Sequence, residues 1–179
     1  MKKFLLAIVL ALLLCPVWAE DESCLSLALD LRAFDALFLP TLQAQAEVKM
    51  NINTEFSLRL PVTLTSELRQ NDIRFWESGL FLDYHPFRTP LYLSVSLVQM
   101  GMFSGLDKPE SSILYLNEVA FGYTWYISKT LYIEPRLVIT DPSGVFESAY
   151  ELLMLTFPDR SKFRIFFLFG WEALAIPSL

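Results

Sequence analysis

The chain has a single histidine, His85, and the residues near it in sequence are the first candidates for catalytic chemistry. Asp83 lies two residues earlier, so both side chains project from the same face of an extended strand. Ser94 or Ser96 could approach from the following strand. A histidine that shares a site with a serine and a carboxylate can activate a nucleophile or a water molecule. His85, Asp83 and Ser94 are therefore the candidate catalytic residues, and a structural turn histidine beside Pro86 is the alternative.

Other catalytic or binding motifs are missing from the sequence. The cysteines are Cys15 and Cys24, and Cys15 lies in a predicted leader, so Cys24 would remain without an intrachain disulfide partner and serve as a packing residue. One histidine and one cysteine far apart do not form a recognisable metal site. No glycine-rich phosphate loop is present. We expect neither a metal nor a cofactor.

The N-terminus has the pattern of an export signal. Two lysines precede the apolar run 4–14, and the small residues Val17 and Ala19 stand at the positions that a signal peptidase reads. The sequence therefore predicts a signal peptide over 1–19 and one mature domain over 20–179.

Two other interpretations of the leader are weaker. The apolar run is short and is soon interrupted by Pro16, which disfavours a retained membrane anchor. A lipoprotein would be acylated at Cys15, but Leu14 stands where a small residue is normally required.

The composition is unusual for a solvated domain. Hydrophobic residues make up 54% of the chain and aromatic residues 15%, whereas lysine is rare after the leader. The formal net charge of −6 argues against nucleic acid, which requires a basic patch. No later stretch has eighteen successive apolar residues, so the sequence excludes a helical membrane protein.

Alternation of apolar and polar residues indicates strands with two different faces. Over 42–64 the even positions are almost all apolar and the odd positions mostly polar. The same period recurs in the segments 25–32, 91–97, 121–127, 131–140 and 163–172, and more irregularly in 73–84 and 147–157. The sequence thus predicts an all-β fold.

The connections between these segments alternate in length, which is typical of outer-membrane barrels. The longer ones are 35–41, 66–72, 104–111 and 141–146, and the shorter ones are 51–53, 85–90 and 128–129. The division gives about nine strands, although a bacterial barrel has an even number. Either 42–64 is one long strand, or the first segment lies outside the sheet. We expect an antiparallel up-and-down transmembrane β-barrel of about eight strands, with ten possible.

The two faces of the strands differ in charge. The apolar positions contain no Asp, Glu, Lys or Arg, and Asn117 is their one clearly polar residue. The other face mixes both signs, which suits a narrow lumen filled with ion pairs. We predict a charged lumen network of Asp30, Arg32, Lys49, Arg59, Glu134, Arg136, Arg164 and Glu172, with Glu47, Glu55 and Lys162 on the same face. A charge facing lipid would be costly, but a soluble barrel would exclude charge from its core equally well.

Three segments resemble small outer-membrane β-barrel proteins of the OmpW and OmpA-barrel type. They are Leu82–Ser94, with its Tyr-His-Pro-Phe turn, Phe121–Tyr126, and Leu131–Arg136. The likeness covers about residues 80–140 and carries no catalytic motif. Such families usually end on a strand with a terminal aromatic residue that the insertion machinery reads, whereas this chain ends Ala-Leu-Ala-Ile-Pro-Ser-Leu.

The resemblance and the alternation together predict a non-enzymatic protein of the bacterial outer membrane. It would be a narrow conduit for small or apolar solutes, or have a structural or surface-interaction role. Its partners would be outer-membrane lipid, the barrel-insertion machinery and periplasmic chaperones, and the sequence leaves its oligomeric state open. One alternative is a soluble periplasmic lipocalin-like barrel that binds an apolar ligand. The other is a lipid A acyl-transfer or deacylase barrel that uses His85, for which Phe87 replaces the serine of the expected His-x-Ser.

Overall fold

A computed structural model describes residues 23–30, 41–67, 73–104 and 113–176, except the side chains of 23–24 and 173–176. The predicted leader over 1–19 and Arg32 lie outside this part of the chain.

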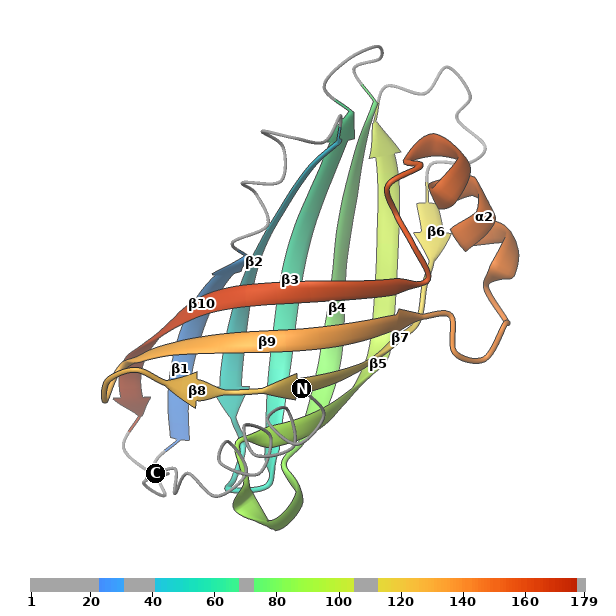
Figure 1. Cartoon of the computed structure of the whole chain (residues 1–179). Helices are drawn as coiled ribbons and strands as arrows, with labels where there is room; N and C mark the ends of the chain where they lie inside the picture. Colours follow the sequence, from blue (N-terminus) through green and yellow to red (C-terminus); the bar gives the residue numbers. More distant parts are fainter. Residues whose placement is uncertain (1–22, 31–40, 68–72, 105–112, 177–179) are drawn as a thin grey trace, which may run out of the picture.

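The described residues form a closed barrel of eight antiparallel strands, so the predicted β-barrel is confirmed (Figure 1). The strands of the barrel are β1 (Ser23–Asp30), β2 (Thr41–Asn51), β3 (Phe56–Glu67), β4 (Arg74–Tyr84), β5 (Leu91–Ser104), β7 (Glu118–Tyr123), β9 (Leu131–Thr140) and β10 (Phe163–Ile176). The short β6 (Ile113–Tyr115) pairs with β5, and β8 (Trp125–Tyr126) continues the pairing of β7 with β9. Since β10 pairs with both β9 and β1, the sheet has no free edge there.

The segment 42–64 is a hairpin, not one long strand. Val48 pairs with Leu60 and Ala44 with Leu64, so even-numbered residues face even-numbered ones across the turn 52–55. The alternation therefore continues unbroken through the turn and does not reveal it. The alternative that the first segment lies outside the sheet is also wrong, because β1 lies between β10 and β2.

The segment 147–157 was predicted to be a strand, and this is wrong. It forms the helix α2 (Glu147–Thr156). Tyr150, Leu153 and Phe157 are buried, and their spacing of three and four residues places them on one side of a helix. Removing this segment from the strand count leaves the even number that a closed barrel requires.

The two ends of the barrel differ in their connections. The turns 52–55, 85–90 and 127–130 lie at one end, which we call the turn end, and the 85–90 turn contains the short helix η2 (Pro86–Arg88). The connection 141–162, which includes α2, joins β9 to β10 at the opposite end, the loop end (Figure 1). The strands β1, β3 and β5 also end there, because neighbouring strands are antiparallel.

The outer surface of the barrel is apolar and its interior is polar. Leucine, valine, isoleucine and aromatic side chains of alternate positions are exposed on every barrel strand, among them Leu27, Val48, Leu60, Leu93, Phe121, Leu137 and Phe167. The intervening positions are buried in the interior, where they include glutamates, arginines, serines and threonines. This distribution is the reverse of that in a water-soluble barrel, whose apolar side chains fill the interior.

Interior glycines make room for aromatic rings on neighbouring strands. A Cβ atom on Gly122 would lie 2.2 Å from the ring of Tyr92, and one on Gly170 would lie 2.0 Å from the ring of Tyr132. These separations are far below van der Waals contact, so each tyrosine ring occupies the space that a side chain in place of the glycine would need.

Candidate functional site

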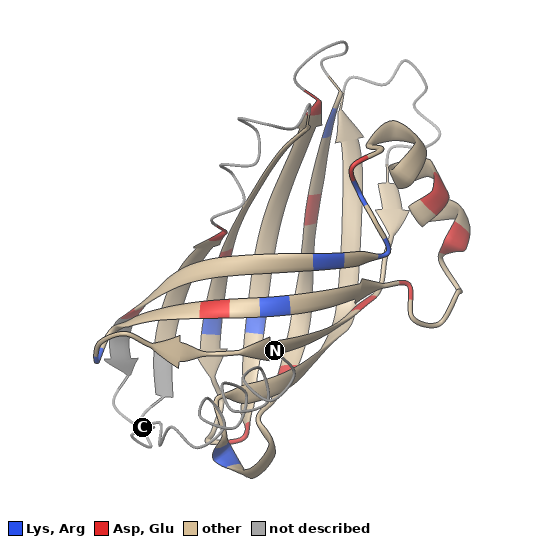
Figure 2. Cartoon of the chain, in the orientation of Figure 1, with Lys and Arg blue, Asp and Glu red and all other residues tan. Residues whose placement is uncertain are grey.

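The barrel interior contains a first group of paired charges toward the turn end, which we call the turn-end charge layer. It consists of Glu47, Lys49, Arg59, Asp83, Glu134 and Arg136, all buried and supplied by β2, β3, β4 and β9. The layer has as many acids as bases. Figure 2 shows the acidic and basic positions along the strands.

Arg136 is the most heavily paired member of this layer. Its Nη1 and Nη2 donate to the two carboxylate oxygens of Glu47 at 2.9 and 2.7 Å. It also forms an ion pair with Glu134, and its Nε donates to the Tyr92 hydroxyl at 2.6 Å. Such a bidentate pair is among the strongest charge-assisted hydrogen bonds.

The other two bases complete the turn-end charge layer. Arg59 pairs with Asp83 at 3.2 Å and with Glu47 at 3.4 Å. Lys49 lies 3.9 Å from Asp83 and 3.7 Å from Glu134. Every base therefore contacts two acids, so the buried charges are compensated across four strands.

A second group of charges, the loop-end charge layer, lies toward the opposite end. It consists of Glu77, Glu118, Arg160 and Arg164. Arg160 donates to Glu77 at 2.6 Å, and Arg164 forms an ion pair with Glu118. Gln99 donates to the other oxygen of Glu77 at 2.5 Å. Arg160 comes from the 141–162 connection rather than from a strand.

Apolar side chains close the interior beyond the loop-end charge layer. This apolar cap consists of Phe75, Phe103, Leu116, Tyr150, Leu153 and Phe157. The last three come from α2 and the residue after it, so the helix packs its buried side on inward-facing rings of β4 and β5. The Tyr150 hydroxyl donates to the carbonyl of Asn117 at 2.7 Å, and burial raises the pKa of Tyr150 above its usual value.

A small cavity separates the two charge layers. Its volume is about 20 Å³, and its lining includes Arg59 and Arg136 of the turn-end charge layer and Glu118 and Arg164 of the loop-end charge layer. That space holds about one water molecule and is too small for a larger solute.

The predicted lumen residues divide between these places. Lys49, Arg59, Glu134 and Arg136 lie together in the turn-end charge layer, and Arg164 lies in the loop-end charge layer. Asp30 is buried in the interior. Glu172 is half-buried near the turn end and accepts a hydrogen bond from the Tyr126 hydroxyl at 2.5 Å.

Of the residues on the same predicted face, Glu47 contacts both arginines of the turn-end charge layer. Glu55 instead lies in the 52–55 turn, and Lys162 is exposed immediately before β10. Both differ from the prediction because they fall at strand ends, where the interior meets solvent.

The candidate catalytic residues do not form a hydrogen-bonded histidine, serine and aspartate set. Asp83 and Ser94 both accept hydrogen bonds from Arg59. His85 instead lies in the 85–90 turn, where Nδ1 is 3.3 Å from the Thr89 carbonyl and Nε2 is 3.4 Å from the Ser57 hydroxyl. Burial, followed by repulsion from Lys49, lowers the pKa of His85 to about 4.

Sequence reasoning missed Glu77, Glu118 and Arg160. Glu77 has the same parity as the inward-facing Phe75 and Asp83, so the irregular segment 73–84 did contain the signal. Glu118 shares its parity with Ala120 and Gly122, but lies before the alternation that begins at 121. Arg160 lies outside any strand, so no periodicity could indicate it.

No family model matches this chain, and no curated protein matches it significantly. Within 23–30, 41–67, 73–104 and 113–176, no helix is long and apolar enough to cross a membrane. The same residues include no group of His, Cys, Asp and Glu side chains placed to hold a metal ion.

Proposed function

We propose that the protein is an outer-membrane β-barrel with a sealed lumen, which has a structural or surface-interaction role rather than serving as an open pore. The observation that carries this proposal is the reversed polarity of the barrel. A continuous outer surface of large apolar side chains is costly in water and stable in hydrocarbon, whereas the paired charges inside are shielded from lipid. For a protein in this location, the proposed partners are outer-membrane lipid, the barrel-insertion machinery and periplasmic chaperones.

The sealed lumen is supported by three consecutive obstructions. A solute would have to pass the turn-end charge layer, a cavity that holds about one water molecule, and the loop-end charge layer beneath the apolar cap. An eight-stranded barrel is narrow enough for side chains to fill its interior. A charged interior also offers little apolar surface to the ligand of a lipocalin-like barrel.

Fractionation and a heat-modifiability gel test the membrane location. We expect the protein in the outer-membrane fraction, resistant to salt washing, and migrating as a compact species in detergent unless it is heated. Recovery in the periplasmic fraction without detergent would support the soluble alternative and refute the proposal.

Planar-bilayer recordings of the refolded barrel test the sealed lumen. We expect no stable ion conductance for the native chain. Steady single-channel steps would instead favour the conduit version, and would show that the two charge layers separate in the membrane.

A further inference from the structure

The three turns at the turn end share a feature that the sealed lumen does not explain. Each presents a large apolar side chain outward: Ile52 is 52% exposed, Phe87 is 91% exposed and Ile127 is 58% exposed. Short turns in contact with water are normally polar, so an exposed apolar residue in each of the three turns needs a physical reason.

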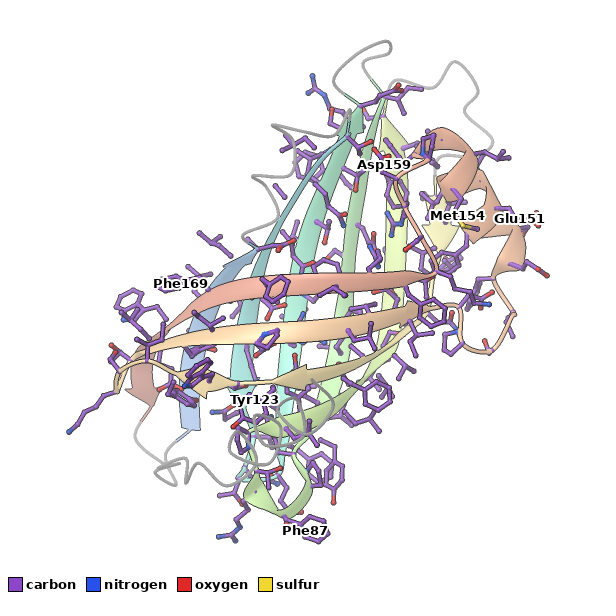
Figure 3. The ribbon with its side chains drawn as sticks, in the orientation of Figure 1. Phe87, Tyr123, Glu151, Met154, Asp159 and Phe169 are labelled. Atoms are coloured by element: carbon purple, nitrogen blue, oxygen red, sulfur yellow. The ribbon has the colours of Figure 1, made fainter. Side chains whose placement is uncertain are left out.

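The 85–90 turn holds its aromatic side chain outward in an unfavourable backbone conformation. Phe87 and Arg88 both have φ of 57°, the left-handed region that non-glycine residues rarely adopt. Thr89 stabilises this conformation, since its N–H and its hydroxyl both donate to the Pro86 carbonyl, at 3.1 and 2.8 Å. Figure 3 shows Phe87 at the outermost point of the turn, pointing away from the barrel. Backbone strain of this kind is retained where it places a side chain for binding.

The other two turns satisfy several of their own backbone N–H groups. The Asn53 side chain accepts from the N–H groups of Glu55 and Phe56, both at 2.8 Å. The Ser128 hydroxyl accepts from the N–H of Leu131 at 3.1 Å and from the N–H of Thr130 at 3.3 Å. Because fewer N–H groups need water, these turns can enter a poorly hydrated environment at lower cost.

The charges on these turns indicate the sign of the charge that surrounds them. The exposed charged residues of 52–55, 85–90 and 127–130 are Arg88 and Lys129, both basic, since Glu55 is half-buried. Two exposed aromatic residues of the outer surface lie near the 127–130 turn: Trp125 is on β8 just before it, and Trp171 on β10 pairs with Leu131 just after it. Apolar tips beside cations, continuous with an aromatic outer surface, match the headgroup layer of an anionic phospholipid leaflet.

We propose that the three turns, through Ile52, Phe87, Ile127, Arg88 and Lys129, bind the anionic phospholipid headgroup layer at the turn end of the barrel. The turns then anchor the barrel in that leaflet instead of projecting into water. This inference rests on the proposed membrane location.

Fluorescent reporters, one in each variant, test the depth of the turns. In the full chain with Cys15 and Cys24 replaced by serine, Phe87→Cys carries a polarity-sensitive label, and Ile127→Cys provides a second reporter. The control is Glu151→Cys on the exposed side of α2. The protein is folded into vesicles of phosphatidylethanolamine and phosphatidylglycerol that include lipids with a quencher on the headgroup. These lipids should quench both reporters severalfold more strongly than the control. The emission of both reporters should also be shifted to the blue relative to the control.

Charge dependence provides the second arm of the experiment. Arg88→Gln combined with Lys129→Gln should reduce the quenching at the Phe87→Cys and Ile127→Cys reporters, as should replacement of all anionic lipid by phosphatidylcholine. The heat-modifiability gel shows whether the barrel is folded in the vesicles. If it is folded but the reporters have the emission spectrum of a label in water, the inference is overturned and a water-soluble partner for the turns is favoured. A barrel that never becomes detergent-resistant in any vesicle would instead refute the membrane proposal itself.

Discussion

The turn-end and loop-end charge layers both pair acids with bases, but they are built from different parts of the fold. The turn-end layer takes every charged member from a barrel strand, so its geometry is fixed by the sheet register. The loop-end layer depends on Arg160, which belongs to the same connection as α2. One layer is therefore part of the rigid barrel wall, whereas the other requires the docking of a long connection. This difference predicts unequal responses to the loss of a single base.

The largest effect is expected in the turn-end charge layer. Replacing Arg136 by Met leaves the buried carboxylates of Glu47 and Glu134 without their closest base, which should lower the free energy of unfolding by about 3–5 kcal/mol. Urea titration of the barrel in detergent micelles measures this change. Lys162→Gln, an exposed charge, is the matched control and should change it little.

Where Arg136→Met alone prevents folding, a double variant keeps the prediction testable. Adding Glu47→Gln removes the unpaired charge, so the double variant should recover part of the lost stability. No recovery would mean that Arg136 contributes by packing rather than by pairing.

A smaller effect is expected in the loop-end charge layer. Arg160→Gln removes the 2.6 Å contact with Glu77, which keeps its hydrogen bond from Gln99 and its 3.9 Å contact with Arg164. The free energy of unfolding should fall by about 1–3 kcal/mol. Limited proteolysis should cleave the 141–162 connection faster while the barrel remains folded. A loss of stability equal to that of Arg136→Met would contradict the difference between the two layers.

The smallest effect concerns His85, which lies beside the turn-end charge layer. Its pKa is about 4 in the folded protein and 6.5 in the unfolded chain, so the unfolded chain binds more protons below pH 6.5. Stability contributed by the neutral imidazole is complete above pH 6.5 and is lost as the pH falls toward 4. His85→Gln should therefore flatten the decrease in unfolding free energy between pH 6.5 and 5. Urea titrations at several pH values measure the unfolding free energy of both proteins. If this free energy falls equally steeply with pH in His85→Gln and in the native chain, the prediction is refuted.

The sequence predicted a large part of the fold, because a barrel strand exposes its two faces to two different surroundings. Leu58, Arg59 and Leu60 show this alternation, with the arginine buried inside and its neighbours turned outward. The same period predicts that Lys49, Glu134 and Arg136 lie on the charged face, where the structure has them. Alternation alone does not mark the 52–55 turn, since the pairing of β2 with β3 preserves parity across it, although the predicted short connection 51–53 overlaps that turn.

The tertiary structure decided the features that depend on contacts between distant segments. Tyr150, Leu153 and Phe157 have helical spacing, but the rings of Phe75 and Phe103 that they bury against come from distant strands, which no local pattern indicates. Arg160, which follows α2 in the 141–162 connection, donates to Glu77 across 83 positions of sequence. Arg59 binds both Asp83 and Ser94, whereas His85 contacts Ser57 and the carbonyl of Thr89, and these contacts join different strands and a turn.

By itself, the sequence determined that this chain forms two-faced strands with a charged face and an apolar one. Only the closed barrel decided that the charged face lies inside. Alternation is a local property of period two, whereas the direction of each face depends on the curvature of the whole sheet and on which charges meet across it.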